Sequence, residues 1–128
     1  MKQPRKKSSP VATTIARHRL QHATTDMQIQ LYCLEEGEPC AATCEIIARI
    51  LSVVADAAAG EVEFGPESPE VRKLRGAASA CEQMARTDAF QRINLVAIDN
   101  ALNAVLELNK KLDPNKVLAL WAARQSGG

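Results

Sequence analysis

Two cysteines four residues apart are the first candidates for chemistry in this chain. Cys40 and Cys44 follow a Gly-Glu-Pro corner at residues 37–39, and Cys33 and Cys81 complete the set of four. If the segments around the corner fold as antiparallel helices and the Cys81 segment returns beside them, all four thiols could gather at one end of a bundle. Such a cluster could bind zinc or form a disulfide. A zinc site usually has two close Cys pairs, however, and only one such pair is present.

The periodicity around these cysteines favours a third interpretation, in which they are ordinary core residues. Apolar residues between 39 and 59 recur at intervals of three and four, which predicts a helix that is apolar over most of its circumference. Cys40 and Cys44 continue the stripe of Ile47 and Leu51. The remaining polar stripe is narrow: Glu45, Arg49, Ser52 and Asp56. Because free cysteine is among the most buried residue types, we expect Cys40 and Cys44 to be buried, reduced and free of metal, and we predict no cofactor.

A second spacing that can hold a metal occurs near the N-terminus. His18 and His22 are four residues apart, and Asp26 follows four residues later, so all three would share a helical face. The neighbouring Arg17 and Arg19 would repel a cation, and the His-Glu-x-x-His motif of zinc proteases is absent. We therefore interpret this segment as a solvated basic stretch.

The rest of the sequence offers little support for catalysis. Both histidines precede residue 25, which leaves no imidazole base for a Ser or Cys nucleophile in the remainder of the chain. The six glycines are scattered and form no phosphate-binding loop. Asp56 and Asp99 could meet across a bundle, but separate solvated positions are far commoner for such residues. We expect that the protein is not an enzyme.

Charge is distributed unevenly along the chain. Residues 1–20 contain six basic and no acidic residues, whereas the other 108 contain ten basic and fifteen acidic residues. We predict a disordered basic arm at residues 1–9 and a single helical domain at residues 10–128. The arm could contact a nucleic-acid backbone, although no aromatic residues are present there to stack on bases. The candidate contacts are Lys2, Arg5, Lys6, Lys7, Arg17 and Arg19.

Capping signals divide the domain into helices. The first helix has two possible starts, Ser9-Pro10 and Thr25, and ends before Gly37. Further starts are predicted at Ser68-Pro69 and Asp113-Pro114. No convincing strand pattern occurs, so the fold class is all-α, an antiparallel bundle of four or five helices.

One stretch leaves two possibilities open. Residues 69–111 have no strong breaker after Gly76, yet the apolar phase slips near Thr87-Asp88. Either one long kinked helix forms, or Asp88 and Gln91 cap a new helix. In the first case the C-terminal half would lack intrachain cover and would need a second subunit, whereas a break would make a monomer tolerable. We expect a two-fold homodimer whose interface is formed by Leu95, Ile98, Leu102 and Val105.

The leading functional hypothesis is a non-enzymatic helical interaction module, a regulatory or adaptor protein that acts as a homodimer on an unknown protein partner. The first alternative is a nucleic-acid-associated protein that uses the basic arm. The second is a thiol or metal protein that uses Cys33, Cys40, Cys44 and Cys81. Because no apolar run approaches the roughly 20 residues of a membrane span and no secretory signal is visible, we expect a cytoplasmic protein without membrane contact.

Overall fold

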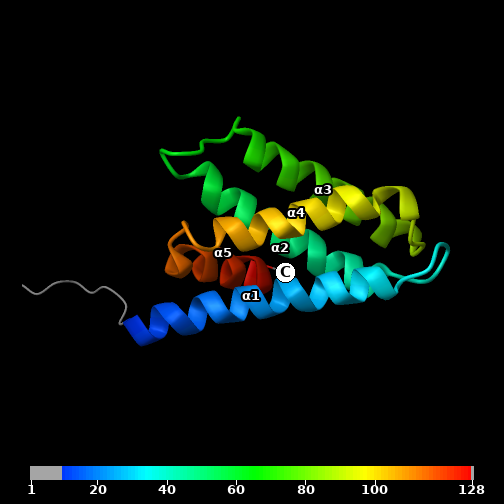
Figure 1. Ribbon diagram of the computed structural model, residues 1–128, viewed down its shortest axis with the longest axis horizontal. Helices are drawn as coiled ribbons and strands as arrows, with labels where there is room; N and C mark the ends of the chain where they lie inside the picture. Colours follow the sequence, from blue (N-terminus) through cyan, green and yellow to red (C-terminus); the bar gives the residue numbers. More distant parts are fainter. Residues whose placement is uncertain (1–9, 128) are drawn as a thin grey trace, which may run out of the picture.

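The computed structural model describes residues 10–127 and, within them, the side chains of residues 14–124. The predicted arm at residues 1–9 lies outside this range. The described residues form no strand, and five α-helices pack together (Figure 1), so the predicted all-α fold class is confirmed. The elements are α1 (Pro10–Cys33), α2 (Ala41–Ala59), α3 (Pro69–Thr87), the 3₁₀ helix η1 (Arg92–Asn94), α4 (Leu95–Leu108) and α5 (Pro114–Gly127).

The helix starts follow the local sequence closely. Ser68 is the N-cap of α3, where its Oγ accepts a hydrogen bond of 3.3 Å from the Val71 amide, and Pro69 occupies the first turn. Helix α5 begins at Pro114, as the Asp113-Pro114 pair predicts. For α1 the earlier of the two predicted starts is correct, because the helix begins at Pro10 and continues through Thr25.

Helix α2 is the centre of the fold and packs against α1, α3, α4 and α5 (Figure 1). Ten of its 19 residues are buried, which fits its nearly continuous apolar surface. Helix α3 runs back along α2 in the opposite direction and makes the most extensive helix contact. Both helices are rich in alanine, and small side chains at a contact let two helix axes approach closely.

Of the two possibilities left open for residues 69–111, the helix break near Asp88 is the one that forms, but the capping role for Asp88 that went with it is wrong. Asp88 ends α3 in the left-handed conformation, with φ of 53°. Its Oδ1 accepts hydrogen bonds from the backbone amides of Cys40 (2.9 Å) and Ala41 (2.8 Å), so it caps α2. Helix α4 begins only at Leu95, too far along the chain for an Asp88 cap. Gln91 precedes η1 and forms no side-chain capping bond.

Backbone hydrogen bonds join the segment that follows Asp88 to the loop between α1 and α2. Phe90 accepts a hydrogen bond of 2.9 Å from the Gly37 amide and donates one of 3.0 Å to the Glu38 carbonyl. The Phe90 side chain is fully buried beneath this junction. The chain therefore reverses after α3, and α4 packs against α1, α2 and α3.

This reversal decides where the predicted interface stripe lies. Ile98, Leu102 and Val105 are completely buried in the core of their own chain, and Leu95 is partly buried. In this conformation the first three side chains offer no surface to a second copy. None of the described helices is both long and apolar enough to cross a membrane.

Candidate functional site

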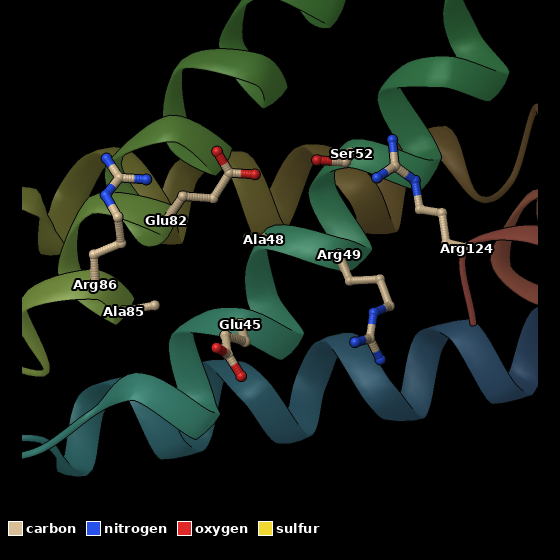
Figure 2. A pocket seen from close by; sticks show the side chains of 8 residues that line it. All are labelled: Glu45, Ala48, Arg49, Ser52, Glu82, Ala85, Arg86 and Arg124. Atoms are coloured by element: carbon tan, nitrogen blue, oxygen red, sulfur yellow. The ribbon is translucent and has the colours of Figure 1, made fainter. Parts of the chain in front are cut away.

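A charged groove runs along the polar stripe of α2, between α3 and α5 (Figure 2). It is an open hollow of about 710 Å³. Figure 2 shows Arg86 and Arg124 toward opposite ends, with Glu82 and Ser52 between them. We call this the α2 groove. Its lining residues are Glu45, Ala48, Arg49 and Ser52 from α2, Glu82, Ala85 and Arg86 from α3, and Arg124 from α5.

The sequence of α2 explains why the groove is there. The narrow polar stripe of α2 faces solvent because burying it would bury its charges, and the other helices cover most of the remaining surface of α2. Ala48 and Ala85 reach only a short way from their helices, so the groove is hollow between longer charged side chains. The sequence therefore predicts the α2 wall of the groove.

The carboxylates of the α2 groove are available to a ligand. Glu45 and Glu82 are exposed and form no ion pair with any described residue. The arginines, by contrast, each have a partner within the chain, although a guanidinium keeps further N–H donors for a ligand. Arg86 donates a hydrogen bond of 2.7 Å to Gln83, and the Arg49 guanidinium carbon lies 5.7 Å from the centroid of the Trp121 ring.

One ion-pair network closes the α5 end of the groove. The Asp56 carboxylate forms ion pairs with Arg124 at 2.9 Å and with Arg75 at 3.0 Å, so it links α2 to α3 and α5. Its carboxylate remains about one-third exposed, and each exposed pair of this kind contributes at most about 1 kcal/mol. Asp99 has different partners, Gln28 (3.1 Å) and Tyr32 (2.7 Å), so the two aspartates serve separate helix contacts. The bond to Asp99 raises the pKa of the Tyr32 hydroxyl.

The cysteines divide into one exposed and three buried residues. Cys40 and Cys44 are buried, as predicted, and so is Cys81, whereas Cys33 is exposed at the end of α1. Burial raises the pKa of the Cys40 thiol to about 12. Contact with the Cys81 thiol, followed by burial, raises the pKa of Cys44 well above its usual range. No group of three or more His, Cys, Asp or Glu side chains in the described chain is placed to hold a metal.

This arrangement predicts the reactivity of the thiols. With an aromatic disulfide reagent, Cys33 should react rapidly in the folded protein, because it is the exposed cysteine. Cys40, Cys44 and Cys81 should react only as fast as the protein unfolds, since all three are buried away from the reagent. The raised pKa values of Cys40 and Cys44 also suppress the formation of their thiolates. Absorbance counting should give one fast and three slow thiols, and all four fast in denaturant. Two or more fast thiols in the native protein would contradict the burial of the cluster.

The histidine pair lies on the outer surface. His18 and His22 are exposed, and their ring centroids are 6.1 Å apart. Asp26 is exposed on the same helix, and the three do not form a metal-binding group. The exposure of both histidines agrees with the interpretation of a solvated stretch at these two positions.

The candidate nucleic-acid contacts are only partly described. Lys2, Arg5, Lys6 and Lys7 lie outside the described residues. Arg17 is partly buried and donates a hydrogen bond of 3.3 Å to the Leu112 carbonyl, so it ties α1 to the start of α5. Arg19 is exposed.

Sequence reasoning missed the other two walls of the α2 groove. Glu82 and Arg86 have the same four-residue spacing as Glu45 and Arg49, and this repeated Glu-x-x-x-Arg pattern is the signal that could have paired the two helices. Nothing local to Arg124 indicates that α5 returns to α2. Comparisons of the chain with protein-family models, with curated proteins and with solved structures found no match.

Proposed function

We propose that this protein is a non-enzymatic helical interaction module, with a regulatory or adaptor role, whose α2 groove binds a segment of a protein partner. The observation that carries the proposal is the pair of exposed carboxylates, Glu45 and Glu82, which have no ion-pair partner within the described residues. Charged residues of this kind around a shallow floor are suited to directing a partner into one register.

The lining of the α2 groove supports binding rather than catalysis. Ser52 is its only hydroxyl-bearing residue among those described, and no histidine or cysteine lines the groove beside it. A serine without an adjacent base is a weak nucleophile. Arg49, which the Trp121 ring holds, is better placed to bind an acceptor than to transfer a proton.

The groove also indicates the form of its occupant. From Glu45 to Ser52 it follows about two turns of α2, roughly 10 Å by the helical rise. The floor of Ala48 and Ala85 admits a close approach, and the charges alternate along the walls. We expect a partner helix or extended segment with a basic residue opposite Glu45 and Glu82 and an acidic residue near Arg86.

A charge-reversal experiment tests this function. In the double variant Glu45→Lys/Glu82→Lys, both groove carboxylates become cations, and no ion pair between described residues is lost. We expect folding stability to change by no more than about 0.5 kcal/mol, as is usual for exposed positions. Quantified affinity capture from the source cells should show a partner that the wild type retains and the double variant loses.

The matched control is Glu36→Lys/Glu63→Lys. It makes the same change in net charge at two exposed loop glutamates that are also free of ion pairs in the described chain. This variant should retain the partner. Equal loss from both variants would show a general charge effect, and retention by both would contradict binding in the α2 groove.

A second copy of the chain is a further proposed partner. Because Ile98, Leu102 and Val105 are buried, a homodimer of this fold needs other apolar residues. Ile93 and Val96, near the start of α4, are 86% and 69% exposed. Tyr32 of α1 is 60% exposed, and its hydroxyl donates a hydrogen bond to Asp99 in the first half of α4. This patch supports self-association through α1 and α4.

Light scattering checks the homodimer directly. At tens of micromolar the wild type should exceed the monomer mass of 13.9 kDa, and Val96→Glu should return it toward that mass without loss of helix content. The exposed position of Val96 makes a folding defect unexpected. A wild type that scatters as a monomer would contradict self-association, while leaving the α2 groove untested by this measurement.

A further inference from the structure

A second pocket, separate from the α2 groove, opens between α1 and α5. It has a volume of about 200 Å³, and most of its lining is apolar. The apolar walls are formed chiefly by Ala16, Leu20, Ala23, Val117, Leu118 and Trp121. Trp121 is fixed as a wall because Arg49 packs over its ring at 5.7 Å. We call this the α1–α5 pocket.

Two polar side chains line this apolar pocket, and both can still form an ion pair or a hydrogen bond with a ligand. Arg19 is exposed and forms no ion pair with a described residue, and no acidic residue is among the described residues of the lining. Asn109 is 6% exposed, and its Nδ2 donates a hydrogen bond of 3.0 Å to the Arg17 carbonyl. That bond orients the amide, while its Oδ1 accepts no hydrogen bond from the described chain. Asn109 Oδ1 is not among the fully buried unpaired atoms of the described residues, so this oxygen remains accessible and can accept a hydrogen bond from a ligand.

We propose that the α1–α5 pocket binds a small carboxylic acid with an aromatic or branched aliphatic body. An apolar cavity of about 150 Å³ is large enough for benzene, so 200 Å³ admits one ring with a short side chain. The apolar body would contact Leu20 and Trp121, and the carboxylate would pair with Arg19, which no acid in the lining neutralises. A hydroxyl or amino group beside the carboxylate would donate to Asn109 Oδ1.

The single tryptophan of the chain makes this proposal easy to test. Trp121 is the only tryptophan and lines the pocket, so its fluorescence reports occupancy. The probe is 3-phenyllactate, which carries a ring, a hydroxyl and a carboxylate, and the matched neutral probe is 3-phenyllactamide. We expect saturable binding of the acid with a Kd on the order of hundreds of micromolar, as the size of the ligand allows. The amide should bind about fivefold more weakly, because its contact with Arg19 lacks the charge.

Variants assign the signal to the pocket. Arg19→Gln should remove the preference for the acid, and Arg72→Gln, at an exposed arginine far along the chain, should preserve it. Ala23→Leu fills the pocket and should abolish the response to both probes. Leu118→Phe repeats the filling at a more exposed position, in case Ala23→Leu lowers stability. Absence of saturation up to about 10 mM, equal affinity for acid and amide, or a response that survives both filling variants would overturn the proposal.

Discussion

The variant Ile98→Glu is expected to be unfolded under conditions where the wild type is fully native. Ile98 is 0% exposed and belongs to the main core cluster, so the substitution places a carboxyl group among apolar side chains. An unpaired buried charge, or the protonation needed to avoid it, costs several kcal/mol. Because a domain of this size is stable by only about 5–15 kcal/mol, that cost is a large share of the total.

A control is available two residues earlier in the chain. Val96 is 69% exposed on the same helix. In protein dilute enough that self-association adds nothing to stability, Val96→Glu should change the free energy of unfolding by no more than about 0.5 kcal/mol. Circular dichroism with urea titration distinguishes the two variants. If Ile98→Glu instead folded normally and only changed its oligomeric mass, the stripe of Leu95, Ile98, Leu102 and Val105 would be a subunit interface after all, and the described packing of α4 would be wrong.

The second large effect is expected at Asp88, although this residue is exposed. Asp88→Ala removes the acceptor for the Cys40 and Ala41 amides and places a Cβ-bearing residue without a polar side chain at φ of 53°. Loss of a helix cap costs about 1 kcal/mol, and the left-handed conformation costs an ordinary residue about 1–2 kcal/mol. We expect a total destabilisation of about 2–3 kcal/mol in urea titration.

Two further variants separate these contributions. Asp88→Gly keeps easy access to the left-handed conformation and loses only the cap, so it should cost about half as much as alanine. Asp88→Asn keeps both an acceptor oxygen and tolerance of that conformation, and its cost should be less than about 1 kcal/mol. A series in which asparagine is as damaging as alanine would contradict the capping role and would point to the negative charge itself.

Much of the helical framework could be predicted because its signals are local. Ser68 and Pro69 specify the start of α3 within one turn, and the apolar periodicity of α2 predicts the burial of Cys40 and Cys44. The Asp88 cap could not be predicted in this way. The amides it accepts from are 47 and 48 residues away in sequence, and their proximity depends on how α3 returns along α2.

The same limit applies to the candidate site and to the stripe on α4. Periodicity shows that Ile98 and Leu102 share an apolar face, but it does not show whether the covering side chains come from the same chain or from another. It also predicts the α2 wall of the groove, because Glu45 and Arg49 interrupt an apolar helix. Arg124 joins that wall only through tertiary packing, so no local pattern reveals it.

The Asp88 cap also constrains the order in which the protein acquires its structure during synthesis. Helix α2 is complete in sequence at Ala59, yet its first-turn amides receive their acceptor from a residue that is translated much later. Until Asp88 and Phe90 have left the ribosome, the α1–α2 loop also lacks its bonds to the α3–α4 junction. The nascent chain should therefore hold α2 with a frayed beginning, and closure of this end should be a late, nonlocal step.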